Sequence, residues 1–447
     1  MAKLAKTTNI VQPKHEHPLL HRAPGDLKPY PGNARKHDEK QLAALMASIR
    51  EFGFNTVITT NEEGMVLAGH GRLEAAKRLG LSTVPTRVVE GLTKAQQRAY
   101  VLADNKTSLM STWDTDQLRI ELDQLVIDDF DIELTGFSTA EFDIMLDDNP
   151  TTQDDPDDVQ PEDCAEQIVS QEGDIYHLGK HRLYCGSCLH NESYALLMNG
   201  DEAQMVITDP PYNVKINGHV TGNGAVQHDE FAMAAGEMSP GEFTDFLSTA
   251  FALIDEFSRE GAIVYSFMDW RHQLEIINAA EPIFGPLKQL CIWVKDNGGM
   301  GQFYRSQHEL VYVFKKGSAA HINNFGLGQN GRYRTNVWSY PGVNTFKGKG
   351  HKLLKLHPTV KPVSMIADAI RDCSKRGGIV LDPFAGSGTI LLAAERTGRH
   401  ARAIELEPKY VDTAIRRWQR VTGESALHVA TGLTFDELAD LRSADKE

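Results

Sequence analysis

Four consecutive residues carry the clearest chemical signal in the chain, Asp209-Pro210-Pro211-Tyr212. The two prolines fix the backbone and remove two N–H donors, so the loop presents rigid carbonyl oxygens between a carboxylate and an aromatic ring. Such a loop suits a planar amine, because Asp209 and the Pro210 carbonyl can accept its two hydrogens while Tyr212 stacks on its ring. The apolar run before it, residues 205–208, predicts a buried strand of a parallel sheet, which places the loop at the sheet's carboxyl edge.

A second motif lies far downstream, where an apolar strand runs into a glycine-rich turn and then a helix over residues 390–396. Glycines let a ligand approach the backbone, and the start of the helix supplies free N–H groups. The next predicted strand, residues 401–404, ends in Glu405, where dinucleotide-binding folds place an acid that binds ribose hydroxyls. The alternative is that Gly386 and Gly388 only close a tight turn between a strand and a helix.

Together these motifs resemble those of DNA amino-methyltransferases that act on adenine N6 or cytosine N4, and their order resembles the circularly permuted class β. His357-Pro358-Thr359-Val360-Lys361-Pro362, before a predicted helix over residues 363–371, matches a third segment of that family. The resemblance spans residues 168–420 and implies a Rossmann-like sheet that uses S-adenosylmethionine on double-stranded DNA. It gives catalytic roles to Asp209, Pro210, Pro211 and Tyr212. The cofactor contacts that it implies are Asp382, Phe384, Gly386, Ser387, Gly388, Thr389, Glu405, His357 and Lys361.

The implied reaction explains these residue types. An exocyclic base nitrogen is conjugated with its ring and is a poor nucleophile, so hydrogen bonds to Asp209 and the Pro210 carbonyl would prepare it for direct attack on the sulfonium methyl group. The base must be flipped out of the duplex, at a cost of a few kcal/mol that stacking on Tyr212 partly offsets. Within the family, Asp at this position is commoner in adenine enzymes, so we expect N6-adenine methylation, with N4-cytosine as the alternative.

The interval between the motifs is basic and rich in aromatic residues. Residues 297–361 hold ten Lys or Arg and one acid, Glu309. Such a composition suits phosphates and unstacked bases, and in the family this interval carries target recognition. The candidate DNA contacts are Arg332, Arg334, Lys347, Lys349 and Lys352, each with a solvated basic face as the alternative. Residues 213–239 are expected to form a mobile loop over the pocket.

The amino-terminal third predicts a separate α+β unit. We expect a helix over residues 38–53, strands at 56–60, 65–67 and 84–89, and a helix opened by Gly69-His70-Gly71-Arg72 with Gly80 as its C-cap. This pattern resembles the ParB/sulfiredoxin-like domain, whose Gly-x-x-Arg turn binds nucleotide phosphate in some members. Gly69, Gly71 and Arg72 are therefore candidate nucleotide contacts, unless the turn only packs. Sulfiredoxin chemistry is excluded, because the first cysteine of the chain is Cys164.

These patterns predict an α/β protein with a Rossmann-like S-adenosylmethionine-dependent methyltransferase sheet and a smaller α+β ParB/sulfiredoxin-like domain. The net charge of −15 is unusual for a DNA enzyme, but residues 141–174 hold thirteen Asp or Glu and no Lys or Arg, so the rest of the chain carries only −2. Helices at residues 93–109 and 115–125 show no helix-turn-helix signature. The expected parts are an N-terminal tail (1–16), the ParB-like domain (17–110), a helical extension (111–146), an acidic flexible linker (147–167), the methyltransferase domain (168–425) and a C-terminal tail (426–447).

Other features narrow the partners. Cys185-Gly186-Ser187-Cys188 has metal-like spacing, but no second pair completes a zinc site, so no metal is predicted. No signal peptide or membrane-length apolar run is seen, so we expect a cytoplasmic protein with no membrane partner. A homodimer is expected from the family alone. Two readings stay open: a nucleotide-gated ParB-like DNA-binding protein with a non-catalytic methyltransferase module, and a nuclease activity of the amino-terminal domain, which shows no clustered acidic metal site.

Overall fold

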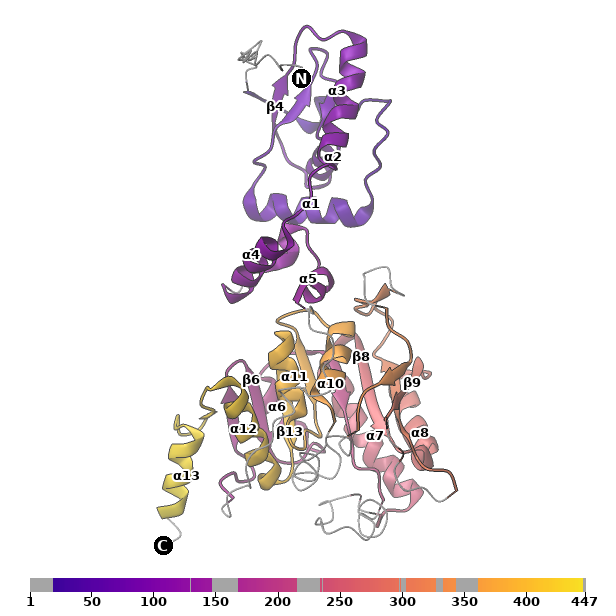
Figure 1. Ribbon diagram of the computed structural model, residues 1–447, viewed down its shortest axis with the longest axis vertical. Helices are drawn as coiled ribbons and strands as arrows, with labels where there is room; N and C mark the ends of the chain where they lie inside the picture. The colour runs from indigo at the N-terminus through magenta and orange to yellow at the C-terminus, as the bar shows by residue number, and fades with distance from the viewer. Residues whose placement is uncertain are drawn as a thin grey trace, which may run out of the picture. The chain divides into compact units, whose positions relative to one another are not determined.

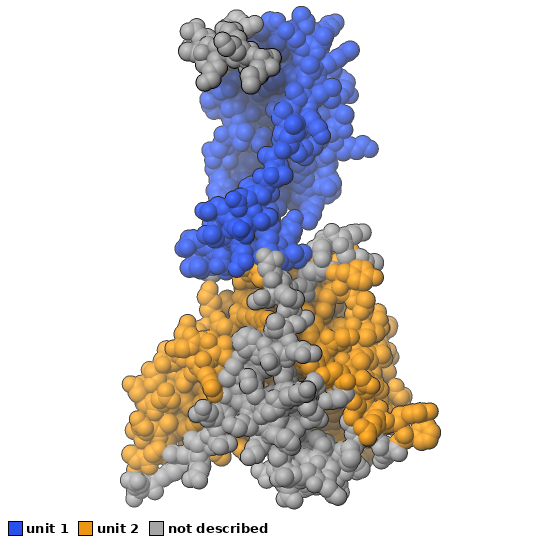
Figure 2. Space-filling model, in the orientation of Figure 1, with its two compact units in different colours: residues 1–145 blue, residues 146–447 orange. Residues whose placement is uncertain are grey.

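The computed structural model describes residues 19–128, 130–146, 168–214, 234, 236–296, 298, 303–326, 333–342 and 361–444. It divides into two compact units, residues 1–145 and 146–447, each with its own sheet (Figure 1, Figure 2). The predicted N-terminal tail and acidic linker lie outside the described residues. No helix among the described residues is both long enough and apolar enough to cross a membrane.

The first unit has a four-stranded sheet in the order β1-β4-β2-β3. Its helices pack on a small core formed by Leu27, Ile58, Val66, Leu73, Ala76 and Val84. Asp38 caps α1 by accepting the N–H of Gln41, and Gly80, at φ +68°, follows the end of α2 in the left-handed region that stops a helix. The elements are β1 (Leu19–Arg22), α1 (Glu39–Phe52), β2 (Ile58–Thr60), β3 (Val66–Ala68), α2 (His70–Arg78), β4 (Val84–Val88), α3 (Lys94–Thr107), α4 (Thr115–Ile127) and α5 (Thr139–Leu146).

The second unit has a ten-stranded sheet in the order β11-β9-β10-β8-β7-β12-β13-β6-β5-β14. Its five central strands, from β8 to β6, are parallel. The chain leaves β7 toward β8 and later returns to β12 on the other side of β7, so the crossovers diverge there and open a crevice at the carboxyl ends of both strands. The strands are β5 (Ile175–Leu178), β6 (His181–Cys185), β7 (Ala203–Thr208), β8 (Ser258–Met268), β9 (Gln289–Val294), β10 (His308–Lys315), β11 (Val337–Ser339), β12 (Ile379–Asp382), β13 (His400–Glu405) and β14 (Leu427–His428).

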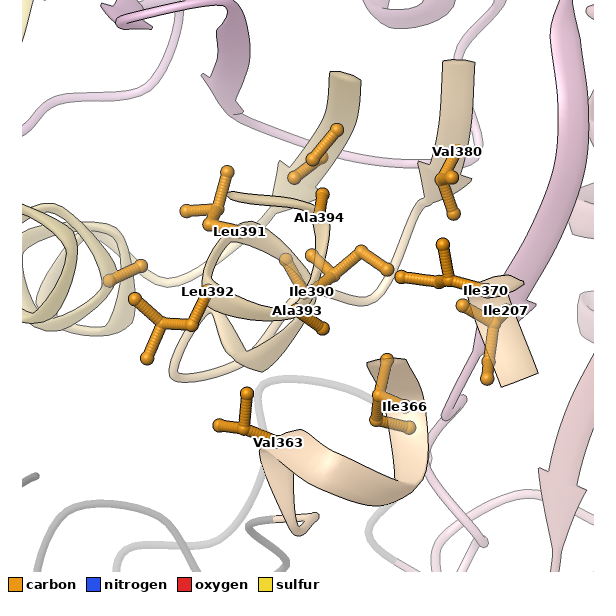
Figure 3. Close-up of a cluster of buried hydrophobic side chains, with 14 of the residues drawn as sticks. Ile207, Val363, Ile366, Ile370, Val380, Ile390, Leu391, Leu392, Ala393 and Ala394 are labelled. Carbon is orange, nitrogen blue, oxygen red and sulfur yellow. The ribbon is translucent and has the colours of Figure 1, made fainter. Parts of the chain in front are cut away.

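Helices cover both faces of this sheet and make three layers. One face packs against α6 (Asn191–Met198), α7 (Pro240–Glu256) and α8 (Gln273–Phe284), and the other against α10 (Val363–Cys373), α11 (Thr389–Thr397) and α12 (Pro408–Thr422). Figure 3 shows Ile366 and Ile370 of α10 close to Ile390 of α11 and Ile207 of β7. Because dense apolar packing resists displacement, this layer holds the ends of β7 and β12 in a fixed register.

The prediction that residues 426–447 form a tail outside the domain is wrong for most of that segment. Strand β14 pairs with β5, and α13 (Phe435–Ala444) buries Phe435 and Leu438 in the large core. Arg442 of α13 donates to both carboxylate oxygens of Asp174, at 2.6 and 3.0 Å. These contacts join residues far apart in the sequence, so local periodicity could not show that this segment belongs to the domain.

Candidate active site

The two motifs meet at the carboxyl edge of the sheet, where β7 and β12 lie side by side. Val380 pairs with Met205 and Leu381 with Val206 in parallel register. One residue further on, the Thr208 hydroxyl donates to Asp382 Oδ1 at 2.7 Å. The prediction that residues 205–208 form a strand is confirmed, since β7 ends at Thr208. Asp209 and Asp382 therefore lie at the same crevice, at the ends of neighbouring strands.

Asp209 is held by two donors. Lys361 Nζ lies 2.5 Å from Oδ2, and the Tyr212 hydroxyl donates to Oδ1 at 2.6 Å. The Lys361 side chain is only 6% exposed, and its ammonium lies over the rings of Phe267 and Tyr212. Burial raises the pKa of the Asp209 carboxyl, and the Lys361 ammonium opposes that rise. In this arrangement Asp209 acts as a hydrogen-bond acceptor at the edge of the crevice.

Glu309, at the start of β10, completes this site and was not predicted as a site residue. Its Oε2 lies 3.3 Å from the Tyr212 hydroxyl and 3.4 Å from Lys361 Nζ, and its Oε1 lies 2.5 Å from Lys295 Nζ. Burial raises the pKa of Glu309, but Lys361 and Lys295 outweigh it and lower the pKa to about 2. The signal in the sequence was its isolation as the single acid in a basic interval.

The glycine-rich turn joins β12 to α11 and is fixed by Glu405. Gly386 and Gly388 have φ values of +52° and +77°, in the left-handed region. The Gly386 N–H donates to Glu405 Oε2 at 2.7 Å, and the Glu407 N–H donates to Oε1 at 2.9 Å. A Cβ on Gly388 would lie 2.5 Å from the Ala414 Cβ. Tight packing therefore makes glycine necessary at Gly388, whatever ligand the turn holds.

Two carboxylates give this end of the crevice an acidic character. Burial raises the pKa of both Asp382 and Glu405 to about 7, against smaller lowering effects of their hydrogen bonds. No Lys or Arg of the described ranges forms an ion pair with either group. Buried carboxylates without a cation favour a ligand that brings positive charge or several N–H and O–H donors. Phe384 is partly buried beside Phe246, with ring centroids 6.0 Å apart.

The remaining predicted cofactor contacts fall into three groups. Ser387 and Thr389 lie in the turn and at the start of α11, with Arg417 donating to the Ser387 carbonyl and hydroxyl at 2.7 and 2.9 Å. Lys361 contacts the carboxylate of Asp209 rather than the glycine turn. His357 lies outside the described residues. The cofactor roles of His357 and Lys361, which the resemblance implies, stay predictions.

The predicted DNA contacts can be examined at one position. Arg334 donates to Asp372 Oδ2 at 2.9 Å and to the Tyr340 hydroxyl at 3.1 Å, and lies 3.5 Å from Asp368. Its guanidinium is therefore engaged inside the protein, which sequence composition could not show. The other candidates, Arg332, Lys347, Lys349 and Lys352, lie outside the described residues, as does most of the expected loop 213–239. In the described part of the interval, Phe303 and Tyr304 are 90% and 81% exposed.

In the amino-terminal unit, the Gly-x-x-Arg turn opens α2. Gly69, at φ +91°, is the N-cap and gives no side-chain hydrogen bond, so the first-turn N–H groups have no side-chain cap. His70 Nε2 accepts the Tyr30 N–H at 3.3 Å, and the His37 ring packs 3.0 Å from where a Cβ of Gly71 would lie. The described parts of both units contain no group of three or more His, Cys, Asp or Glu that could hold a metal ion. Cys185 and Cys188 are buried free thiols whose pKa values are raised by that burial.

Comparison with known families divides the chain into three matched segments. Residues 203–416 match the N6/N4 family described as DNA methylase, residues 20–106 the ParB N-terminal domain, and residues 116–172 the ParB-methyltransferase HTH domain. The last match corrects the reading of the helical extension, in which no helix-turn-helix signature was found. The described part of that segment contains α4, a short 3-10 helix over Ile132–Thr135 and α5.

Individual relatives match shares of the chain that differ in size. The ParB-like nuclease domain-containing protein YnaK of Escherichia coli (strain K12) is 40% identical over 80 residues, which are 18% of this chain and 92% of YnaK. The type II methyltransferase M.ScaI of Streptomyces caespitosus is 37% identical over 87 residues, 20% of this chain and 29% of M.ScaI. The crystal structure of the M1.HpyAVI–SAM complex is 20% identical, with a TM-score of 0.37, over 53% of this chain and 98% of that one.

Proposed function

We propose that this chain, which matches the N6/N4 DNA methylase family over residues 203–416 and the ParB N-terminal domain over residues 20–106, transfers a methyl group from S-adenosylmethionine to N6 of adenine in double-stranded DNA. One observation carries the proposal: the hydrogen bond of 2.7 Å between Thr208 and Asp382 brings the Asp209 loop and the glycine turn to one crevice. A methyl donor at the turn and an acceptor base at the loop would then be neighbours.

The residues of the crevice fit the proposed cofactor. S-adenosylmethionine would supply an electrophilic methyl group on a sulfonium ion, together with an ammonium group and two ribose hydroxyls. Asp382 and Glu405 are buried carboxylates with raised pKa values, so both gain from a cationic ligand that donates hydrogen bonds. We assign the ribose to Glu405, the methionine part to Asp382 and residues 386–389, and the adenine ring to the apolar side near Phe384.

Asp209, Pro210 and Tyr212 would prepare the target base. The amino group donates one hydrogen to Asp209 and the other to the Pro210 carbonyl, which increases the electron density available at its nitrogen. In the described structure the Tyr212 hydroxyl occupies Asp209 Oδ1, so we propose that the base amine takes its place there. The Tyr212 ring would stack on the flipped base, and Pro211 would keep the loop rigid.

Identification of the methylated nucleoside tests the choice of base. Purified protein is incubated with labelled S-adenosylmethionine and unmethylated genomic DNA, and the nucleosides released by digestion are identified by mass spectrometry. N6-methyladenine is the expected product. N4-methylcytosine would keep the reaction type but overturn the choice of adenine, and DNA without label would overturn the proposed activity.

We also propose that the amino-terminal unit binds a nucleotide. The N–H groups at the start of α2, which have no side-chain cap, and the guanidinium of Arg72 would together bind a phosphate next to Gly69 and Gly71. The expected result is saturable binding of CTP or ATP that is lost in Arg72→Ala. No binding of either nucleotide by the full chain would overturn this assignment without affecting the proposed methyl transfer.

A further inference from the structure

Asp209 and Glu309 are two buried carboxylates joined by two shared donors. Lys361 Nζ lies 2.5 Å from Asp209 and 3.4 Å from Glu309. The Tyr212 hydroxyl lies 2.6 Å from Asp209 and 3.3 Å from Glu309. The four groups therefore form a closed ring in which each donor contacts both acids.

Lys295 fixes Glu309 from outside this ring. Lys295 follows β9 and Glu309 lies in β10, and the two strands pair antiparallel with Val294 opposite His308. Lys295 Nζ contacts Oε1 of Glu309, whereas Lys361 and Tyr212 both contact Oε2. The Lys295 main chain is tied to Gln307 by two hydrogen bonds of 2.9 and 2.8 Å. One carboxylate oxygen is thus engaged by the strand pair and the other is directed at the ring.

We propose that Glu309 is a positioning residue for the methyl transfer proposed above: it holds Lys361 against Asp209, accepts the Tyr212 hydroxyl when the base amine takes its place at Asp209, and balances the charge of Lys361. The inference rests on that proposed function. Glu309 touches neither the base nor the cofactor in this account, and acts through Asp209 and Tyr212.

The charge of the ring explains why a carboxylate is needed. Methyl transfer would break the S–CH3 bond, leaving a neutral thioether, and form an N–CH3 bond, so that one positive charge moves to the base nitrogen next to Asp209 until that nitrogen loses a proton. Lys361 places a fixed positive charge on the far side of Asp209, which would oppose that movement if it were unbalanced. Because two cations hold the pKa of Glu309 at about 2, Glu309 is ionised at neutral pH, and its charge offsets that of Lys361. With the Lys361 charge offset, Asp209 can stabilise a cation forming at the base.

Neutralisation of Glu309 tests the proposal in the full-length protein. We expect Glu309→Gln to lower kcat at least 30-fold while the KM for DNA and the Kd for S-adenosylmethionine stay within threefold of wild type. Glu309→Asp keeps the charge and should recover part of the lost kcat. The matched control is Asp255→Asn, which removes a carboxylate 3.7 Å from Lys316 at the opposite, amino edge of the same sheet, and should behave as wild type.

A second readout does not depend on methyl transfer. The titration of Lys361 is followed by NMR with lysine labelled at Cε and assigned through Lys361→Arg. Its ammonium faces Asp209, Glu309, the Tyr212 hydroxyl and the Phe267 ring, so loss of the Glu309 charge should shift its titration to lower pH. If Glu309→Gln does not fold, the same comparison with Glu309→Asp should show a smaller shift in the same direction.

The outcomes separate the two proposals. A Glu309→Gln kcat within threefold of wild type, or an unchanged Lys361 titration, would overturn the role of Glu309 while leaving the methyltransferase assignment intact. If kcat, the affinity for S-adenosylmethionine and the melting temperature all fall together in Glu309→Gln, the role of Glu309 would also be overturned, because that pattern indicates a merely structural residue. Absence of methyl transfer by the wild type itself would overturn the proposed function, and the Lys361 titration would still report on the ring.

Discussion

The buried carboxyl of Glu405, in the candidate cofactor site, lowers the unfolding free energy when it is ionised. Its carboxyl is buried and its pKa is about 7, compared with 4.5 for an ordinary Glu. Because the folded protein binds the proton more tightly than the unfolded chain, this group stabilises the fold below about pH 4.5 and loses that contribution as the pH rises through 7. The loss amounts to roughly 3 kcal/mol by pH 8.

Glu405→Gln should therefore flatten the pH dependence of stability. The variant loses one acceptor for the Gly386 or Glu407 N–H, so its unfolding free energy falls at pH 5. Between pH 5 and 8, however, it should decline by roughly 2–3 kcal/mol less than that of the wild type without cofactor. Urea unfolding at the two pH values measures this difference. Parallel curves for the two proteins would show that Glu405 does not titrate in this window.

Gly388 provides a test of packing in the turn. Its φ of +77° and the 2.5 Å approach of the Ala414 Cβ oppose any larger side chain. Gly388→Ala should cost about 2–4 kcal/mol of unfolding free energy and remove cofactor binding. Gly423→Ala is the matched control, because Gly423 has φ +75° and nothing within 4 Å of the added Cβ, so only about 1 kcal/mol should be lost. Equal losses in the two variants would mean that the Ala414 contact contributes nothing.

Three residues show where reasoning from sequence reached its limit at this scale. The types of Asp209 and Tyr212 and their place after an apolar strand were sufficient to predict that they share a site. Lys361 and Glu309 could not be paired in the same way, because their contact depends on strand register and on a fold in which the chain returns to β7 after more than 100 residues. Arg334 looked like a surface cation because charge composition does not report the acids that the fold places beside it.

At the scale of elements, strong periodicity and flanking turns made most strands and helices of the site predictable. The run at 205–208 became β7, the run after the glycines became α11, and the segment after His357 became α10. Two C-terminal elements were missed: β14 has only two residues, and α13 packs against the domain through Phe435, Leu438 and the ion pair of Arg442 with Asp174. Such elements depend on distant partners, which local patterns do not encode.

The contact between β11 and α10 gives a prediction at this scale. Arg334, just before β11, pairs with Asp368 and Asp372 of α10, so Arg334→Gln removes the cation that these two acids share, while Arg371 still lies 3.4 Å from Asp368. We expect a loss of about 3 kcal/mol in unfolding free energy and no change in the salt dependence of DNA binding. In Lys347→Gln, by contrast, the slope of log K against log salt should decrease by about 1 with little change in stability. If the slope of log K against log salt also decreased in Arg334→Gln, Arg334 would be a DNA contact after all.

At the scale of the whole molecule, the two units have separate sheets and separate cores. We propose that residues 147–167, which are strongly acidic in sequence, serve as a linker between them. Limited proteolysis should then cut within this segment first and leave two fragments, each with its own cooperative melting transition. Initial cleavage inside either sheet would contradict this organisation.

The amino-terminal unit and the helical extension extend the molecule beyond a methyl-transfer module. Matches to ParB and HTH families in residues 20–172 indicate a DNA-associated part in addition to the methylase. We also propose a homodimer, for which sedimentation of the full chain with and without DNA is the direct measurement. A monomer under both conditions would leave the chemistry of the crevice unchanged.

If Asp209 acts on the base and not on the cofactor, its removal should separate methyl transfer from cofactor binding. Transfer of labelled methyl groups to DNA and equilibrium binding of S-adenosylmethionine are measured for the wild type and Asp209→Ala. We expect the variant to lose transfer by at least 1,000-fold, or about 4 kcal/mol, while its cofactor affinity stays within threefold. Turnover retained in Asp209→Ala, or cofactor binding lost together with turnover, would contradict it.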